Sequence, residues 1–332
     1  MSKIRPPFPL LSAAAALLLC GTCAKESSAQ TNPSDLQLNL AVPFHFVAYG
    51  DARFHDPKDT VNSNPAVRVA LVQAVADANP AFICFTGDLV FHGYDYDDWK
   101  VWDRETAPWR EKKIPVFPTL GNHELYGDEK IDLANYFLRF PDLNHSRYYS
   151  VRAANILILV LDSSLDEVSG AQGDWLNHEL DRVPFGVDFV FLVLHHPPYT
   201  SSSASTTGEG HEARHQEQAL ATGIEERQAH AAYRFIVFSG HVHNYERHEH
   251  GGVTYFVSGG AGAHAYPIER AHDDPFQSKE INYHYLLVDV EPKQLSVTMH
   301  RLDLTTGKPV WTQPDSVKIT VPAAAAANAA GQ

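Results

Sequence analysis

Short, almost wholly apolar runs alternate with amphipathic segments along most of this chain, and this alternation restricts the fold more than any other feature. Apolar runs of this kind suit strands that are buried on both faces of a sheet. Alternation with helices predicts an α/β layered fold. The expected strands are Phe44–Tyr49, Phe82–Phe85, Val116–Thr119, Ile156–Leu161, Phe189–Leu194 and Phe235–Phe238, and the expected helices are Pro65–Asn79, Asp97–Glu111, Lys130–Phe140 and Gln172–Val183.

The later part of the chain has a different pattern. The runs Tyr255–Val257, Tyr283–Val290 and Gln294–Arg301 resemble antiparallel strands, and a short turn at Glu291–Lys293 joins the last two. We therefore expect a pair of mixed sheets rather than one purely parallel sheet.

One domain is expected, because no long linker interrupts the alternation and 44% of the 332 residues are hydrophobic. We assign residues 41–321 to this domain and residues 30–40 to a polar leader. Residues 322–332 form an Ala-rich tail without apolar periodicity beyond alanine, so we expect them to be disordered.

Residues 1–29 have the pattern of a signal peptide. Lys3 and Arg5 precede an apolar stretch from Phe8 to Leu19, and small residues follow at 27–29. The stretch is short of the roughly 20 residues that span a bilayer, so we expect no stable membrane span. The sequence predicts export to the periplasm or the extracellular space.

The cysteines favour a protein without disulfides. Cys20 and Cys23 lie near the end of the leader, but Leu19 and Thr22 before them make a poor lipoprotein signature, so a lipid anchor is the less favoured alternative. Cleavage near residue 29 leaves only Cys84, which lies in an apolar run and is expected to be a core residue.

The charge of the chain argues against a nucleic-acid partner. The formal net charge is −14, and no cluster of lysine and arginine follows the first few residues. A basic footprint for nucleic acid is therefore not expected.

Polar side chains follow several of the expected strands, where each strand ends. Ligands collect outside the carboxyl ends of strands in α/β sheets, so these distant segments are expected to meet at one crevice. A single such motif is weak, but several in order indicate a site. The segments are YGD51, FTGD88, PTLGN122H123, LVLH195H196 and FSGH241VH243.

Oxygen and imidazole groups without thiolates favour Zn, Mn or Fe. Carboxylates balance the charge of two adjacent cations, and one carboxylate can bridge both. Two metals about 3.5–4 Å apart clamp a phosphate and convert a bridging water to hydroxide at neutral pH. The residues therefore predict hydrolysis of phosphoesters.

The motifs resemble the calcineurin-like metallophosphoesterase superfamily and, within it, the purple acid phosphatase-like branch. The resemblance runs from residue 44 to about 302, and it implies two packed mixed β-sheets flanked by helices, a four-layer sandwich with a dimetal site at one edge. The segments that carry it are GNHE at 121–124, HHPPY at 195–199, GHVHNYER at 240–247, SGGAGAH at 258–264 and QGDWLNHEL at 172–180.

The resemblance also implies roles for single residues. Asp88 is expected to bridge two metal ions, which are Fe, Mn or Zn. In the HHPP pair the family pattern places the ligand at His195, which leaves His196 structural. The remaining expected ligands are Asp51 and His243 for the first ion, and Asn122, His195 and His241 for the second.

Two residues of GNHE have further expected roles. His123 should protonate the leaving alkoxide or stabilise charge on the phosphorus. Glu124 could orient His123 or, as we slightly prefer, cap the following helix.

The first motif departs from the family pattern. The wider superfamily has Asp-x-His there, and purple acid phosphatases have Asp-x-Gly together with a tyrosine three residues after the second aspartate. This chain has Arg53 and Phe91 at these positions. We expect a weak first metal site, unless His55 or His92 supplies a ligand, and an iron-loaded protein without purple colour.

Arg53 has two interpretations. It can grip a substrate phosphate oxygen, because a guanidinium offers planar, bidentate recognition, and it would then count as a catalytic residue with His123. Alternatively it forms an ion pair with Asp51 or a surface acid.

Residues around the motifs could shape substrate choice. The polar stretch 200–230 is either an overhang of the crevice or a solvated loop with one helix near Glu212–Ala221. His211 or His215 within it could reach a phosphate, and His264 could support the ligands. An aromatic wall could form from Tyr94, Tyr96, Trp99 and Trp102, although helix packing explains the two tryptophans better.

The leading function is an exported, metal-dependent phosphohydrolase for small phosphoesters, with monoesters favoured. One alternative is a phosphodiesterase for cyclic nucleotides or nucleotide sugars. Another is a weakened phosphate-binding pseudoenzyme in which Arg53 replaces one metal, although the other motif residues speak against full loss of activity.

Overall fold

The computed structural model describes residues 33–165, 170–203 and 211–322. These residues belong to one compact unit. The expected signal peptide and Ala-rich tail fall on residues outside this part of the chain. No helix of the described ranges combines the length and the apolarity needed to cross a membrane.

Two mixed β-sheets form the centre of the fold, as the sequence predicts. The first sheet has the order β1 (Asp35–Leu38), β5 (Tyr149–Ala153), β6 (Ile156–Val160), β7 (Phe189–Val193), β8 (Arg234–Ser239), β10 (Val253–Ser258), β9 (Tyr245–His250). The second has the order β13 (Val310–Thr312), β12 (Gln294–Asp303), β11 (Tyr283–Glu291), β2 (Phe44–Tyr49), β3 (Ile83–Phe85), β4 (Val116–Pro118), with β14 (Ser316–Thr320) also paired to β12.

Parallel strands form the middle of the first sheet and one side of the second. Strands β6, β7, β8 and β10 run parallel to one another, and so do β2, β3 and β4. Antiparallel pairs complete each sheet, for example β11 with both β2 and β12. The prediction of mixed sheets is therefore confirmed.

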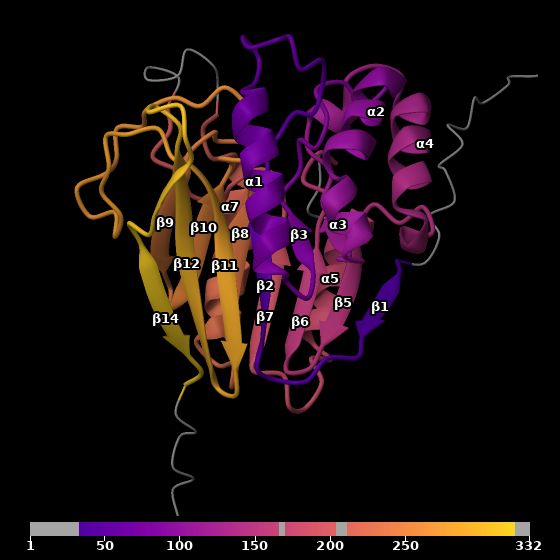
Figure 1. Cartoon of the computed structure of the whole chain (residues 1–332). Helices are drawn as coiled ribbons and strands as arrows, with labels where there is room; N and C mark the ends of the chain where they lie inside the picture. Colours follow the sequence, from indigo (N-terminus) through magenta and orange to yellow (C-terminus); the bar gives the residue numbers. More distant parts are fainter. Residues whose placement is uncertain (1–32, 166–169, 204–210, 323–332) are drawn as a thin grey trace, which may run out of the picture. The chain divides into compact units, whose positions relative to one another are not determined.

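Helices cover the outer faces of the sheets (Figure 1). On the second sheet, Trp109 packs against Tyr49 of β2 with ring centroids 6.2 Å apart. On the first sheet, Leu176 and Ile224 join a buried cluster with strands β6, β7 and β8. The α-helices of the described ranges are α1 (Pro65–Ala78), α2 (Tyr96–Glu105), α3 (Ala107–Glu111) and α4 (Glu129–Arg139) beside the second sheet, and α5 (Gly170–Leu180) and α7 (His215–Gln228) beside the first.

The core between the sheets is aromatic. Phe46 of β2 lies edge-on to Phe191 of β7, with ring centroids 5.3 Å apart, and it also contacts Phe238 of β8. All three side chains are fully buried. This contact fixes the two sheets against each other at the strands whose ends carry the predicted site.

Local sequence explains where α1 begins and ends. Asn64 accepts a hydrogen bond from the Val67 N–H at 3.2 Å, and Pro65 takes the first helical position. At the other end, Asn79 adopts the left-handed conformation and its N–H donates to the Ala76 carbonyl.

The single helix expected over Asp97–Glu111 is wrong, because α2 ends at Glu105 and α3 begins at Ala107. Pro108 has no N–H to continue the helix ladder. The Thr106 hydroxyl instead donates to the Trp102 carbonyl at 2.6 Å. The chain therefore changes direction at Thr106.

Part of the polar leader is structured. Asp35–Leu38 forms β1, which pairs in parallel with β5 so that Asp35 lies opposite Ser150. Strand β5 itself was not expected from the sequence, although its inner residues Tyr149 and Val151 are fully buried. The folded unit thus extends upstream of residue 41.

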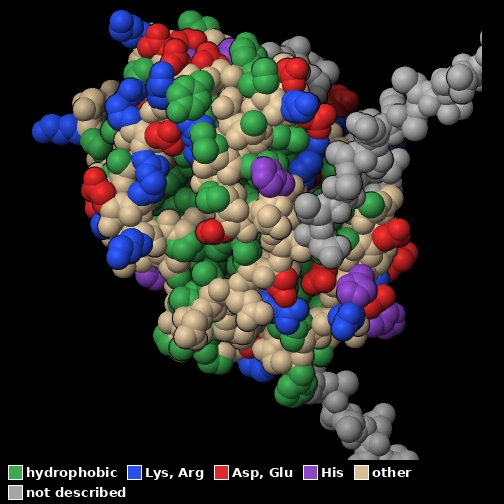
Figure 2. Space-filling view, turned by 90° about the vertical axis from the view of Figure 1, so that its right-hand side faces the viewer, with side chains coloured by type: hydrophobic (Ala, Val, Ile, Leu, Met, Phe, Trp, Pro, Cys, Tyr) green, Lys and Arg blue, Asp and Glu red, His purple; other side chains and the backbone are tan. Residues whose placement is uncertain are grey.

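Basic, acidic and apolar side chains are interspersed on the face of the described residues that Figure 2 shows. This face presents no continuous basic surface.

Candidate metal centre

The predicted site residues meet at the ends of strands from both sheets. Asp51 and Asp88 follow β2 and β3, while His195 and His241 follow β7 and β8. Ligand atoms of Asp51, Asp88 and His195 lie within 4.8 Å of one another, and so do ring nitrogens of His195, His196 and His241. The distant segments are therefore brought together as expected, and we call the space between their side chains the crevice.

Asn122, His195 and His241 form what we call the imidazole side of the crevice. Oδ1 of Asn122 lies 3.0 Å from Nε2 of His195 and 3.1 Å from Nδ1 of His241, and the two ring nitrogens are 3.2 Å apart. Three donor atoms therefore converge, with Oδ1 of Asp88 3.4 Å from the His195 nitrogen.

Asp51, Arg53 and His243 form what we call the arginine side. Nε2 of His243 lies 3.8 Å from Oδ1 of Asp51, and this fully buried nitrogen has no hydrogen-bond partner. Both carboxylate oxygens of Asp51 accept the His241 N–H, each at 3.0 Å.

Three histidine rings are oriented by backbone carbonyls. Nδ1 of His195 lies 2.8 Å from the Thr86 carbonyl, and Nδ1 of His243 lies 2.8 Å from the His264 carbonyl. Because a carbonyl only accepts, each Nδ1 carries the proton and each Nε2 is left for the crevice. His264 thus supports the site through its main chain. Nδ1 of His123 contacts the Phe91 carbonyl in the same way at 2.8 Å.

The site residues hold unusual backbone conformations. Asp51, Arg53, Asp88 and His241 have positive φ angles of 64°, 48°, 52° and 69°. Such conformations cost free energy in residues other than glycine and concentrate at functional sites.

Glycines precede the predicted ligands because no side chain fits there. A Cβ at Gly121 would lie 2.3 Å from Oδ1 of Asp88, and one at Gly240 would lie 2.3 Å from Oδ2 of Asp51. The repeated glycine of the strand-end motifs is therefore a requirement of close packing around the two carboxylates.

Burial controls the charges of the site. It lowers the pKa values of His195, His241 and His243, so the three rings are neutral, as metal ligands must be. Burial and the nearby Asp88 raise the pKa of Asp51, and the Arg53 guanidinium opposes them. Burial also raises the pKa of Asp88, but His123, His195 and Arg53 outweigh it and hold that pKa below its usual value.

Glu124 has neither of its expected roles. Its carboxylate accepts the N–H groups of Asp88 at 2.9 Å, Val90 at 3.1 Å and Gly121 at 2.8 Å. Asp128 caps α4 instead. Glu124 therefore connects the loop that carries Asp88 to the loop that carries Gly121. Burial and the neighbouring charge of Asp88 raise the pKa of Glu124 to about 8.

Arg53 forms an ion pair, but with a partner that the sequence did not indicate. Its Nε and Nη2 each lie 3.4 Å from Oδ2 of Asp88, rather than beside Asp51 or a surface acid. The guanidinium lies 5.9 Å from the centre of the Phe91 ring. Its side chain keeps 12% exposure, whereas that of Asp88 is fully buried.

The two histidines considered as substitute ligands are held elsewhere. Nε2 of His55 lies 3.1 Å from Asp59, and Nδ1 of His92 lies 3.4 Å from Asp98. Neither position supplies a third side-chain ligand on the arginine side in this arrangement.

The polar stretch after HHPPY contributes His211 but not His215, which begins α7. The His211 ring lies 4.7 Å from the His241 ring, and its Nδ1 is 2.9 Å from the Tyr266 hydroxyl. That hydroxyl accepts the His243 N–H at 3.2 Å. Tyr266 was missed by the sequence analysis, since it lies outside every motif. The helix expected near Glu212–Ala221 is α7, which runs from His215 to Gln228.

His196 and the aromatic residues occupy the surroundings. Nδ1 of His196 lies 2.9 Å from the Ser163 hydroxyl. Trp99 and Trp102 are buried in helix packing, whereas Tyr94 is 45% exposed and lies beside His92. Tyr126 is 46% exposed, and its ring lies 4.5 Å from the His123 ring.

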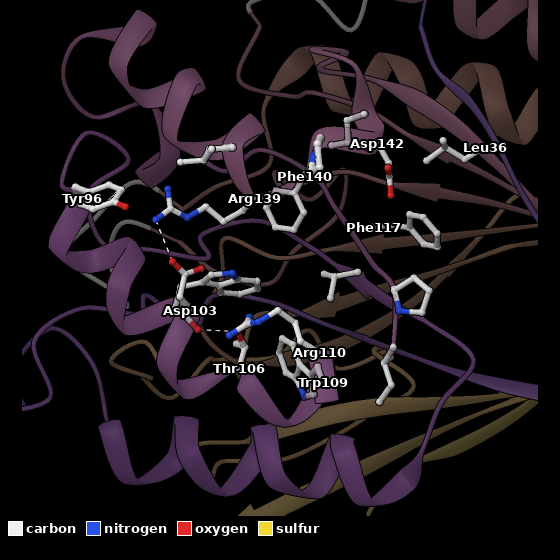
Figure 3. Close-up of a pocket in the computed structure, with 17 residues that line it drawn as sticks. Leu36, Tyr96, Asp103, Thr106, Trp109, Arg110, Phe117, Arg139, Phe140 and Asp142 are labelled. Atoms are coloured by element: carbon white, nitrogen blue, oxygen red, sulfur yellow. Dashed lines mark hydrogen bonds and ion pairs between the residues drawn. The ribbon is translucent and has the colours of Figure 1, made fainter. Parts of the chain in front are cut away.

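A separate pocket of about 460 Å³ lies away from these residues, between α2, α3, α4 and β4 (Figure 3). Trp109, Phe117 and Phe140 line it. Of its two acidic residues, Asp103 and Asp142, the first is paired with Arg139 at 3.1 Å. This pocket shares no residue with the predicted ligand set.

The donor atoms fit a metal ion better on one side than on the other. The imidazole side offers two neutral nitrogens and an amide oxygen beside a carboxylate, which suits Zn, Mn or Fe. The arginine side offers the unpartnered Nε2 of His243 and the carboxylate of Asp51, but a permanent cation lies beside them.

Several known proteins resemble the chain. Purple acid phosphatase 23 of Arabidopsis thaliana is 29% identical over 177 residues, which are 51% of this chain and 36% of that protein. Purple acid phosphatase 1 of Ipomoea batatas is 29% identical over 229 residues, 63% of this chain and 44% of that protein. The chain thus spans less than half the length of these relatives.

Solved structures support the fold. The purple acid phosphatase PPD1 from yellow lupin superposes with a TM-score of 0.63 at 15% identity, over 85% of this chain and 54% of that one. The family model for calcineurin-like phosphoesterases matches residues 34–245, a range that includes every predicted ligand. The chain therefore belongs to the calcineurin-like phosphoesterase family, as its strand-end motifs predict.

Proposed function

We propose that this protein is an exported, metal-dependent hydrolase of small phosphoesters, with monoesters favoured. The observation that carries the proposal is the convergence of Asn122 Oδ1, His195 Nε2 and His241 Nδ1 beside the Asp88 carboxylate. Membership of the calcineurin-like phosphoesterase family and the similarity to purple acid phosphatases support it.

A metal ion held by these groups supplies Lewis acidity and positive charge beside the phosphoryl group, and it lowers the pKa of a neighbouring water. The protein orients the ligands through the carbonyls of Thr86 and His264 and through the N–H groups that Glu124 ties together. Iron, manganese and zinc all suit this donor set.

Arg53 binds a phosphoryl oxygen in this proposal. Its Nε and Nη2 face Asp88, and its remaining N–H groups and partial exposure leave donors for the crevice. A guanidinium and a metal ion bind non-bridging phosphoryl oxygens, and a monoester offers one more of these oxygens than a diester.

His123 delivers the proton to the leaving oxygen. Its Nδ1 is engaged with the Phe91 carbonyl, so Nε2 is the transferring atom, 3.8 Å from Oδ2 of Asp88. Burial lowers its pKa to about 4, although Asp88 opposes this, so the protonated form accumulates in acid. This favours an acid phosphatase.

The test is hydrolysis by the full chain after metal removal and reloading with Mn, Zn or Fe. We expect turnover of 4-nitrophenyl phosphate to exceed that of bis(4-nitrophenyl) phosphate, and Asp88→Asn to abolish both. A preference for the diester would instead support the phosphodiesterase alternative. Phosphate binding without turnover of either ester would contradict the proposal and support a binding protein.

Export has a separate test, because it depends on residues 1–29. We expect the mature protein in the periplasm or medium, with its N-terminus near residue 30. An intact N-terminus on protein that stays in the cytoplasm would refute this part of the proposal.

A further inference from the structure

We propose that the guanidinium of Arg53 takes the place of the metal ion on the arginine side, so that the centre binds a single ion on the imidazole side. This inference rests on the proposed function for its metal-dependent site, and it concerns the number of ions that the site holds.

The two oxygens of Asp88 have different partners. Oδ1 faces the imidazole side, at 3.4 Å from Nε2 of His195, and it also accepts the His123 N–H at 3.1 Å. Oδ2 faces the guanidinium of Arg53 at 3.4 Å. The carboxylate that would bridge two ions therefore bridges the imidazole side and an arginine.

The guanidinium is built into this position. The Arg53 N–H donates to the Asp88 carbonyl at 3.0 Å, and the Arg53 carbonyl accepts from Nη1 of the fully buried Arg68 at 3.1 Å. Phe91 lies beside the guanidinium. Hydrogen bonds therefore fix both the N–H and the carbonyl of Arg53, and the side chain of Arg53 points toward Oδ2 of Asp88.

A metal ion on the arginine side would have few ligands, and the positive charge of Arg53 would repel it. Of the predicted ligands among the described residues, Asp51, His243 and Oδ2 of Asp88 remain there, and the last is paired with Arg53. A divalent ion bound to these groups would lie close to a permanent cation in a buried region, where charges are poorly screened. Phe91 offers no oxygen, and the His55 ring is oriented by its Nδ1, 2.6 Å from the Arg53 carbonyl, with Nε2 3.1 Å from Asp59.

The experiment counts bound ions rather than turnover. The full chain is stripped with a chelator, reloaded with excess Mn²⁺, freed of unbound ion and analysed for metal per chain. Electron paramagnetic resonance then reports whether two Mn²⁺ ions are coupled. We expect one ion and no coupling in the wild type.

Variants of Arg53 test whether its guanidinium is what prevents a second ion from binding. Arg53→His replaces the cation with a ligand and is expected to bind two coupled ions, while the matched control Arg53→Lys keeps the charge and is expected to bind one. Arg53→Gly tolerates the positive φ of 48° and serves as a second variant if Arg53→His does not fold. It is expected to regain a second, more weakly bound ion.

The outcomes separate this inference from the proposed function. Two ions per wild-type chain, or none, would overturn the inference. One ion in the wild type and also in both Arg53→His and Arg53→Gly would overturn the role of the guanidinium. One ion in an inactive wild type would uphold the inference and refute the proposed hydrolase, whereas two ions with turnover would do the reverse.

Discussion

The imidazole side and the arginine side of the crevice are built in the same way but carry different groups. On both sides a glycine-containing loop after a strand presents a polar side chain in a left-handed conformation, as at His241 and Asp51. Asn122, His195 and His241 present neutral donors, whereas a guanidinium adjoins Asp51 and His243. The same backbone framework can thus present either ligands for a metal or a fixed organic cation.

The largest expected effect is loss of a ligand on the imidazole side. His195→Ala should lower kcat/KM by about 1000-fold or more, because a metal supplies several kcal/mol of charge stabilisation. Metal content and phosphoesterase kinetics measure the effect. The control is His196→Asn, which can keep the bond to Ser163 and should retain metal. Equal losses in the two variants would mean that this side is not the metal-binding side.

The second prediction concerns His123, which lies between the two sides. His123→Asn should lower kcat by about 100-fold for alkyl phosphates, and by less for 4-nitrophenyl phosphate, whose leaving group needs no proton. In the wild type, alkyl phosphate turnover should rise as the pH falls from 7 towards the His123 pKa of about 4. The same loss for both leaving groups would exclude a proton donor.

A smaller effect is expected when the arginine side loses its charge. In protein stripped of metal, so that no second ion can replace the guanidinium, Arg53→Ala should weaken phosphate binding by about 10- to 100-fold, because a charged hydrogen bond contributes about 1.5–3 kcal/mol. Arg53→Lys should lose less, since it keeps the charge but not the planar pair of donors. Isothermal titration with inorganic phosphate measures both. Unchanged affinity in Arg53→Ala would leave Arg53 with only its ion pair to Asp88.

The smallest effect concerns the support behind the arginine side. His284 is fully buried, and its Nε2 lies 3.0 Å from the Ser258 hydroxyl. The Ser258 carbonyl accepts the N–H of Gly50, the residue directly before Asp51, at 2.9 Å. Burial lowers the pKa of His284 to about 4 in the folded chain. In the unfolded chain the same ring has its ordinary pKa of about 6.5, so between these two pH values it is protonated only when the chain is unfolded.

This difference in proton binding makes the folded state less stable as the pH falls. Stability contributed by the neutral ring is present above pH 6.5 and is lost as the pH falls towards 4. Between pH 6.5 and 5.5 the loss should be about 1 kcal/mol. Denaturant unfolding of the wild type and His284→Gln at the two pH values checks it. An equally steep loss in the variant would exclude His284 as the source.

Buried strands and strand-end motifs were accessible from the sequence because their signals are local. The strand expected at Phe44–Tyr49 has the same first and last residues as strand β2 of the structure. Strand β5 was missed because Tyr149–Ala153 includes Ser150 and Arg152 and lacks a continuous apolar run. The break at Thr106 had a local signal in Pro108 that the expected single helix did not take into account, while the Thr106 hydroxyl bond to the Trp102 carbonyl was visible only in the structure.

The sequence by itself determined the family, the layered fold and the set of candidate ligands, since apolar runs of strand length place the residues that follow them at one sheet edge. It also showed that Arg53 and Phe91 occupy positions where related phosphoesterases usually have metal ligands or a glycine–tyrosine pair. Only the tertiary structure decided that Arg53 pairs with Asp88 and that Glu124 binds backbone N–H groups of two loops. The contacts of Arg53 and Glu124 with Asp88 are decided by side-chain rotamers and join segments more than thirty residues apart, which no local pattern encodes.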